Sequence, residues 1–393
     1  MHNKNILISG AGIAGPALAY WLNRYGFTTT VVERARALRE GGQAVDFRGE
    51  AHLTVLRRMG ILEEVHAMRT AMGDQVVVNA EGRKVASLPS GFMSGDVEIH
   101  RGDLSRIIHD RTKDGTEYVF GDWITSITES ADGVHVTFAH GEPRDFDLVL
   151  GADGLHSGVR ALVFGDESRF LHELGYYVAG ISVPNHLDLD RTGLIYNEPN
   201  RGVLLASDRD RSVASAAFFF ASPRLSYDRH DVDQQKKLVS DAFAHVGWET
   251  RRLLSHLPDA TDFYFDSIAQ IRMDRFTKGR VALVGDAGYG ATLGGLGTGL
   301  AIVSAHVFAG ELALANGDHR VAFPRYVEAI TDYARGCQKV AGNAGPFLAP
   351  ATRAKIWQRN QTYRMLSSRP LAGFFNKLST KAANGITLRN YPG

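Results

Sequence analysis

The sequence predicts an α/β fold in which a parallel sheet is interrupted by an inserted, mostly antiparallel β-sheet and followed by C-terminal helices. Two glycine-rich turns indicate the parallel sheet, because each follows a short apolar run typical of a strand buried on both faces. One turn spans residues 10–15, and the other begins at residue 285. From about residue 175 to residue 266, short alternating segments replace this pattern, as expected of antiparallel strands.

The first turn lies inside a complete β-α-β unit. Residues 5–9 form the predicted first strand, and residues 14–25 form a helix with Pro16 in its first turn and Gly26 at its end. A β-branched run over residues 28–33 completes the unit as the second strand. This arrangement is typical of a Rossmann-type nucleotide-binding fold.

The glycines of the first turn have separate roles in such a fold. Gly10 permits the tight turn, Gly12 lets a pyrophosphate approach the backbone, and Gly15 lets helix and strand pack closely. The phosphates are expected at the N-terminus of the helix, where backbone N–H groups lack partners. The predicted contacts at this turn are Gly10, Gly12, Ile13, Ala14 and Gly15.

Charged residues at the end of the second strand extend this predicted site. Glu33 follows the glycine turn by about 20 residues, where a carboxylate can accept hydrogen bonds from ribose hydroxyls. Arg34 comes next and is predicted to attract cofactor phosphates. A solvated surface loop is the alternative interpretation of Arg34.

The second turn follows a predicted strand over residues 281–284. Gly285 and Asp286 therefore lie at the carboxyl end of a strand, where open α/β sheets bind ligands, and Asp286 is a candidate to hold a ribityl or ribose chain. Further glycines lead into a predicted helix over residues 298–315, whose N-terminus carries partial positive charge. Such an end can stabilise negative charge on the pyrimidine edge of a flavin, and the predicted contacts are Leu296 and Gly297.

Composition excludes several classes of protein. The 393 residues are too many for one ordinary core, and a net charge of +1 with no long block of one sign gives no electrostatic reason to expect nucleic acid as a partner. Cys337 is the only cysteine, which excludes an intrachain disulfide and a Cys-rich zinc cluster, and no metal site is predicted. We expect a cytoplasmic protein, since we find no signal peptide and no stretch approaching the roughly 20 apolar residues of a membrane span.

Three motifs occur in a fixed order along the chain. They are G-x-G-x-x-G at residues 10–15, D-G-x-x-S-x-V-R at residues 153–160, and Gly285-Asp286. In this order they resemble the motifs of the single-component, class A flavoprotein aromatic hydroxylases, the family of para-hydroxybenzoate hydroxylase and the tetracycline-inactivating monooxygenases. The resemblance spans most of the chain, and it implies that Asp153 and Arg160 belong to the cofactor site.

The same resemblance implies three further flavin-site residues and shows one departure. The family's flavin-contacting arginine, in an R-x-x-L setting, corresponds to Arg101 with Leu104, and Asp46 matches a contact of the tetracycline-type members. After the Gly-Asp pair the family commonly has histidine and then two prolines. Here Tyr289 replaces the histidine and the prolines are absent, so the loop that carries the flavin ring is expected to differ.

The resemblance also implies the reaction. FAD is bound, NADPH or NADH reduces it transiently, and O2 then adds to form a flavin C4a-hydroperoxide. This species hydroxylates an aromatic, phenolic or polyketide-like substrate, with a tetracycline-type molecule as one candidate. The alternatives are a flavoprotein reductase, dehydrogenase or halogenase of the same fold that inserts no oxygen, and a non-catalytic flavin- or drug-binding protein. The halogenase motif W-x-W-x-I-P is missing, which weakens that alternative.

The predicted domains follow the two patterns and the resemblance. The FAD-binding domain comprises residues 1–73, 96–174 and 267–335; the substrate-binding sheet comprises residues 74–95 and 175–266; the C-terminal helical segment comprises residues 336–393. The chemistry is expected to reside in the cofactor, so no catalytic side chain is predicted. The substrate-pocket candidates are Phe92, Tyr196, Phe218, Phe220 and Thr292. We expect a monomer or weak homodimer.

Overall fold

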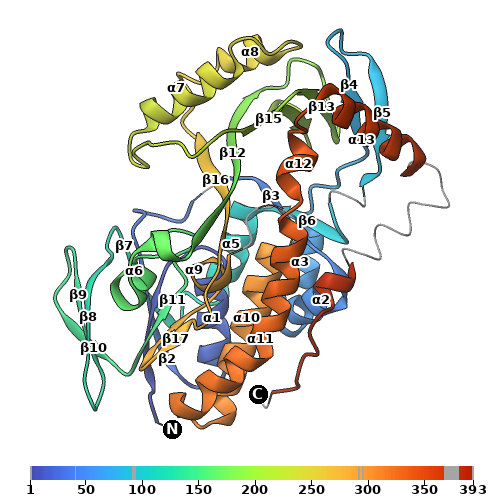
Figure 1. Ribbon diagram of the computed structural model, residues 1–393. Coiled ribbons are helices and arrows are strands. Elements are labelled where there is room, and N and C mark those ends of the chain that lie inside the picture. The colour runs from blue at the N-terminus through green and yellow to red at the C-terminus, as the bar shows by residue number, and fades with distance from the viewer. Residues whose placement is uncertain are drawn as a thin grey trace.

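The computed structural model describes residues 2–39, 41–90, 94–290, 293, 296–366 and 380–391. Two large sheets dominate it: a six-stranded, mainly parallel sheet and a seven-stranded, mainly antiparallel one (Figure 1). Helices of the C-terminal part run from the first sheet to the second. The predicted fold class, a Rossmann-type α/β domain with an inserted antiparallel sheet and C-terminal helices, is confirmed.

The six-stranded sheet has the order β17-β18-β11-β1-β2-β7, with parallel pairing from β18 to β7. Its core strands are fully buried, and Ile6, Leu7 and Ile8 of β1 expose no surface. Apolar residues on both faces of a parallel strand require helices on both sides. The strands are β1 (Asn5–Ser9), β2 (Thr28–Glu33), β7 (Thr116–Phe120), β11 (Leu148–Gly151), β17 (Thr277–Lys278) and β18 (Val281–Leu283).

One long apolar helix, α10 (Gly297–Leu314), packs between the first and last long helices of this domain, α1 (Ala14–Arg24) and α11 (His319–Ala341). By length and composition alone this helix could cross a membrane, although no stretch of the sequence is predicted to do so. It is 78% buried, so its apolar surface belongs to the protein core. The other helices of this part of the chain are α2 (Gly49–Arg58), α3 (Leu62–Ala67), α5 (Arg101–Asp110), α6 (Gly158–Phe164), η1 (Glu167–Arg169) and α9 (Asp286–Tyr289).

The seven-stranded sheet has the order β16-β12-β15-β14-β13-β4-β5 and is antiparallel except where β13 meets β4. Two helices, α7 (Val232–Phe243) and α8 (Thr250–Leu254), cover its outer face (Figure 1). α12 (Ala344–Leu348) and α13 (Arg353–Leu366) pack on the other side and at the β5 edge. The strands are β4 (Gln75–Val78), β5 (Lys84–Leu88), β12 (Leu171–Pro184), β13 (Thr192–Glu198), β14 (Arg201–Ser207), β15 (Val213–Ala221) and β16 (Tyr264–Ile271).

Two small sheets complete the described structure. β3 (Ala44–Phe47) and β6 (Val97–His100) form a ribbon beside the glycine turn, while β8 (Ile124–Glu129), β9 (Val134–Phe138) and β10 (Arg144–Phe146) form a separate three-stranded sheet. The sequence analysis does not predict the β3–β6 ribbon, β7 or β16. In the ribbon, Asp46 pairs with Glu98, and this polar pattern resembles a loop.

The chain returns to the first domain after α13. Within residues 380–391, the Asn384 side chain accepts a hydrogen bond from the backbone N–H of Ala51 at 3.1 Å. The hydroxyl of Tyr391 donates to the Glu311 carboxylate of α10 at 3.0 Å, and Glu311 is only 1% exposed. The end of the described chain therefore covers helices that belong to the parallel sheet.

Candidate active site

The predicted motifs converge at one edge of the parallel sheet. The glycine turn follows β1, Asp153 follows β11, Gly285 follows β18, and Glu33 ends β2. These four strands are direct neighbours and run parallel, so their carboxyl ends meet. Open α/β sheets bind ligands at that edge.

The first turn is close-packed by necessity. Gly10 has φ +105°, and a Cβ placed on it would lie 2.5 Å from the Ala152 carbonyl oxygen. A Cβ on Gly15 would lie 1.9 Å from the carbonyl oxygen of Gly10. Only glycine fits at either position, because the first lies in the left-handed region and the second carries the start of α1 against β1.

Gly12 faces a different environment. A Cβ there would meet only the guanidinium of Arg101, at 3.4 Å, so the turn leaves space over Gly12 beside a cation. Glu33 lies on the other side, where its carboxylate accepts from the backbone N–H groups of Ala11 and Ala35 at 2.8 Å each. Each carboxylate oxygen can accept further hydrogen bonds, so Glu33 keeps capacity for hydroxyl donors.

The second turn touches the first. Gly285 has φ +66°, and a Cβ there would lie 3.3 Å from Ala14 Cβ of α1 and 3.4 Å from Ala301 Cβ of α10. Three small residues therefore hold both turns and both helices in one unit. Leu296 caps α10 and Gly297 begins it, so the N-terminus of α10 points to the same edge.

A buried histidine supports the first turn of α10. Nδ1 of His52 accepts a hydrogen bond from the backbone N–H of Arg48 at 3.1 Å, and Nε2 lies 2.7 Å from the Tyr333 hydroxyl. Burial, followed by the charge of Arg48, lowers the pKa of His52 to about 3, so the ring is neutral. Gly299 lies directly against this ring, and a Cβ on it would be 2.0 Å from the ring carbon Cε1.

Asp153 and Arg160 support the site from within. Asp153 accepts from the Ser157 hydroxyl at 2.5 Å and from the backbone N–H of Val159 at 3.1 Å, which fixes the start of α6. Arg160 is fully buried and donates to the carbonyl oxygens of Ala287 at 3.0 Å and Leu155 at 2.7 Å. Its guanidinium thus fastens the Gly285-Asp286 turn, which makes its role in the cofactor site indirect.

Replacing Arg160 by methionine is expected to lower the free energy of unfolding by about 3 kcal/mol. The change removes a buried partner of Glu167, whose carboxylate lies 3.0 Å from the Arg160 guanidinium. It also leaves two buried carbonyl groups without this donor. Arg229→Gln is the matched control, because Arg229 contacts the same carboxylate at 2.7 Å from an exposed position. That control is expected to cost less than about 1 kcal/mol in urea unfolding, and equal losses would contradict the assignment.

The remaining predicted cofactor residues differ in their surroundings. Asp46 is buried and paired with Arg48, and burial, opposed by that arginine, raises the pKa of Asp46 to about 6. Arg34 is exposed and stacks 4.7 Å over the Trp123 ring. Leu104 is fully buried in α5. No hydrogen bond or ion pair between described residues joins Asp46 or Arg34 to the glycine turn.

The structure places three of the substrate-pocket candidates in a hydrophobic core. Phe218 and Phe220 pack edge-on against Phe243 of α7, at 5.2 Å and 5.9 Å between ring centres, and Tyr196 packs against Trp248 at 5.8 Å. All three side chains lie in the core between the sheet and the outer helices, so they are packing residues. Phe92 and Thr292 lie outside the described residues.

The opposite face of the sheet carries residues that the sequence analysis missed. Residues directly opposite in antiparallel strands share a face, so Phe219, Val178 and Asp266 lie together, as do Gly180 and Tyr264. A Cβ on Gly180 would meet nothing closer than 3.9 Å, which leaves open space on this face. Because side chains alternate between the two faces of β15, Phe219 points to the face opposite Phe218 and Phe220. This alternation is the sequence signal that could have indicated Phe219.

Tyr264 lies on this second face of the sheet, which we call the inner face, and interacts electrostatically with residues of the cofactor motifs. Burial raises the pKa of Tyr264, with a further increase from Asp266 and Asp286 and an opposing effect of Arg101. The phenol therefore lies within electrostatic range of two predicted flavin-site residues, Arg101 and Asp286. Tyr264 makes no side-chain hydrogen bond within the described part of the chain, and its ring is partly exposed.

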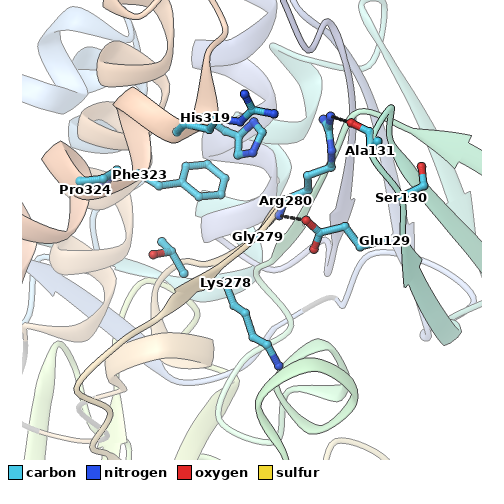
Figure 2. Close-up of a pocket in the computed structure, with 11 residues that line it drawn as sticks. Glu129, Ser130, Ala131, Lys278, Gly279, Arg280, His319, Phe323 and Pro324 are labelled. Atoms are coloured by element: carbon cyan, nitrogen blue, oxygen red, sulfur yellow. Dashed lines mark hydrogen bonds between the residues drawn. The ribbon is translucent and has the colours of Figure 1, made fainter.

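A cavity of about 400 Å³ lies at the opposite edge of the parallel sheet (Figure 2). Two of its charged side chains are bonded to backbone groups: Glu129 accepts from the backbone N–H of Arg280 at 3.0 Å, and the Arg280 guanidinium donates to the Ala131 carbonyl at 2.6 Å. Lys278 points away and donates to Val163 at 2.9 Å. None of the predicted site residues lines this cavity, so it is not the active-site candidate.

Tyr289, the departure from the family pattern, is a core residue. It is 4% exposed, its hydroxyl lies 2.6 Å from that of Tyr326, and its ring centre lies 5.0 Å from that of Phe276. Tyr326 in turn donates to the Leu283 carbonyl at 3.0 Å. The tyrosine therefore links the second turn to α11.

The residues at this edge fit FAD. The turn leaves room over Gly12 for a pyrophosphate with Arg101 beside it, while carboxylates at Glu33 and Asp286 match the hydroxyls at the two ends of the nucleotide. The N-terminus of α10 suits an electron-rich ring edge. These features come from strands that are neighbours in the sheet.

Comparisons with known proteins agree with this fit. The family model described as "FAD binding domain" matches residues 3–322. A flavin-dependent monooxygenase of Legionella longbeachae is 38% identical over 394 residues, covering 99% of this chain and 98% of the relative. The solved structure of tetracycline destructase Tet(51) has a TM-score of 0.87 with 37% identity and full coverage of both chains. That of Tet(55) has a TM-score of 0.85 with 39% identity, covering 99% of each chain.

These findings confirm FAD as the cofactor that the sequence predicts, and NAD(P)H is the reductant typical of the family. The chain spans nearly the full length of these relatives, so the comparison applies to the whole enzyme. The chain belongs to the FAD-binding domain family and is a flavin-dependent monooxygenase.

Proposed function

We propose that this monooxygenase hydroxylates a phenolic polyketide of the tetracycline type. Two solved structures that match almost the entire chain, at 37% and 39% identity, are tetracycline destructases. The observation that carries the proposal is the inner face of the seven-stranded sheet, where Tyr264 and Phe219 flank open space above Gly180. A fused aromatic ring system needs such a flat apolar wall with one polar handle.

The cofactor would be held from both glycine turns. When bound, FAD supplies the redox chemistry that activates O2, and the protein binds and orients the reactants and excludes water. Arg101 and the N-terminus of α1 neutralise the pyrophosphate, while Asp153 and Arg160 fix the turns. The proposed FAD-site residues are Gly10, Gly12, Ile13, Ala14, Gly15, Glu33, Arg34, Asp46, Arg101, Leu104, Asp153, Arg160, Gly285, Asp286, Leu296 and Gly297.

Tyr264 would orient the substrate. Its hydroxyl lies within electrostatic range of Arg101 and Asp286, and its raised pKa keeps it protonated. A protonated phenol can donate a hydrogen bond to an enolate or phenolate oxygen, while the Phe219 ring supports the ring system. Correct orientation decides whether activated oxygen reaches the substrate or is lost as hydrogen peroxide.

The boundaries of the three segments given in the sequence analysis form part of this proposal, as do a cytoplasmic location and a monomer or weak homodimer. The grouping of the strands supports the proposed boundary between the FAD-binding and substrate-binding parts, since strands from residues 75–88 and 171–271 share one sheet. Small-molecule substrate and O2 fit a monooxygenase of this family.

The test is a substrate-dependent oxygenation assay on the purified, FAD-loaded protein. With tetracycline, we expect faster NADPH oxidation and a product heavier by one oxygen atom in mass spectrometry. NADPH oxidation without oxygen uptake would support the reductase alternative and contradict the proposal. Oxygen uptake that yields only hydrogen peroxide with tetracycline, but a hydroxylated product with a simple phenol, would overturn the tetracycline assignment.

Tyr264→Phe is expected to raise the share of NADPH that ends as hydrogen peroxide at least about threefold, because the substrate loses its orienting hydrogen bond. Tyr196→Phe is the matched control. Its hydroxyl bonds Glu198 at 2.8 Å in the outer core of the same sheet, so its coupling ratio is expected to equal that of the wild type. Equal ratios in both variants would contradict the role of Tyr264.

A further inference from the structure

The tip of the β14–β15 hairpin contacts the cofactor domain. Asp208 Oδ2 lies 2.5 Å from Nε2 of His100, the last residue of β6. Both side chains are largely buried, at 25% exposure for His100 and 20% for Asp208. The strand that forms part of the substrate sheet therefore ends in a charged contact with the β3–β6 ribbon.

A second contact lies one turn further along. Arg209 donates to the Asp103 carboxylate at 2.7 Å, and its guanidinium also lies 3.6 Å from the Met68 sulfur. His100 and Asp103 flank Arg101 in sequence, at the start of α5. The hairpin thus contacts residues on both sides of Arg101 in the sequence, the arginine assigned to the FAD site.

The segment of residues 100–103 also binds the loop that precedes β3. The backbone N–H of Arg101 donates to Gln43 at 3.2 Å, and that of Gly102 donates to Gly41 at 2.9 Å. Nδ1 of His100 lies 3.4 Å from the Gly42 carbonyl oxygen. Hydrogen bonds therefore connect Arg101 and His100 to the residue 41–43 loop, and the Arg101 guanidinium faces Gly12.

We propose that His100 and Asp208 are positioning residues for the FAD site: their contact couples the substrate sheet to Arg101 and the residue 41–43 loop, and so sets the affinity for FAD. The inference rests on the proposed role of Arg101 in holding FAD. It assigns to the substrate sheet a part in cofactor retention, besides its part in substrate binding.

The contact depends on the proton of His100. The hydrogen bond and charge of Asp208 raise the pKa of His100 above its ordinary value, against the effect of burial. Burial alone would raise the pKa of Asp208, but the bond and charge of His100 hold it below its ordinary value. Asp103 on α5 also favours the charged ring, and Glu98 on β6 and Arg209 on the hairpin are the other charged groups nearby.

The sign of the pH dependence follows. A histidine whose pKa is raised by its partner stabilises the contact below the ordinary histidine pKa and loses that stabilisation as the pH rises through the raised value. FAD is therefore expected to bind more tightly near pH 6 than near pH 9. Asp208 stays ionised over this range, so the change reports His100.

The experiment measures the dissociation constant for FAD by fluorescence quenching at about pH 6 and about pH 9. For the wild type we expect an increase of about tenfold between the two, since a hydrogen-bonded charge pair in a partly buried contact is lost. Asp208→Asn and His100→Gln should both bind at about pH 6 as weakly as the wild type does at about pH 9, with little change between the two. Thermal melts of the FAD-free proteins confirm that the variants fold.

Arg209→Gln is the matched control on the same hairpin. It removes the second contact but no group that titrates in this range, so it should weaken binding equally at both pH values. Wild-type binding at both pH values by Asp208→Asn and His100→Gln would overturn the inference alone. Failure of the wild type to bind FAD at either pH would overturn the proposed FAD site and this inference with it.

Discussion

Replacing Gly299 by alanine is expected to lower the free energy of unfolding by about 3 kcal/mol and to weaken FAD binding at the same time. The added Cβ would lie 2.0 Å from the His52 ring, which cannot move aside because Arg48 and Tyr333 hold both of its nitrogens. The first turn of α10 must shift instead. Urea unfolding and an FAD titration of the same preparation measure the two effects.

Gly336→Ala is the matched control, because Gly336 is also a helical glycine but a Cβ there meets nothing within 4 Å. Alanine is the better helix former, so this variant is expected to be up to about 1 kcal/mol more stable than the wild type and to bind FAD normally. Combining Gly299→Ala with His52→Ala should restore part of the loss, since the two side chains no longer overlap. A Gly299→Ala protein with wild-type stability would contradict this packing.

Replacing Gly15 by alanine is expected to cost more than about 3 kcal/mol of stability and to abolish FAD binding. The new Cβ would lie 1.9 Å from the Gly10 carbonyl oxygen. Gly10 cannot retreat, because it is itself packed against the Ala152 backbone in a left-handed conformation. The start of α1 must therefore separate from β1.

Gly12→Ala separates cofactor binding from folding at the same turn. Its Cβ would meet only the flexible end of Arg101, at 3.4 Å, so the FAD-free protein should melt at the wild-type temperature. The methyl group occupies the space left for the pyrophosphate, and the dissociation constant for FAD should rise at least about tenfold. Equal melting losses for the two variants, or normal FAD binding by Gly12→Ala, would contradict these separate roles.

The cofactor half of the molecule could be predicted well from the sequence, because its signals are local. A glycine with positive φ, a short apolar strand and a helix start occur within a few residues, and the structure has β1, the turn and α1 where they were predicted. The long spacing between the two turns needed the family resemblance. Only the strand order brings Gly285 against Ala14.

The substrate half was less predictable, because strand alternation shows which side chains share a face but not which elements pack against that face. Phe218 and Phe220 alternate with Phe219, but only the position of α7 shows that the first two are core residues. β16 was missed for a related reason. Its Asp266, Ser267 and Gln270 lower the apparent strand propensity. The Asp266 side chain contacts His156, and the Gln270 side chain donates to the Gln338 carbonyl of α11.

The return of residues 380–391 to the parallel sheet has a consequence for biosynthesis. Glu311 on α10 is almost fully buried, and the groups that contact it, Tyr391 and Arg389, are translated about 80 residues later. A nascent chain that has already released α10 from the ribosome still exposes this carboxylate on an otherwise apolar helix. Strands β1, β2, β7 and β11 of the parallel sheet are translated before the substrate sheet is complete, whereas β17, β18 and α10 follow it.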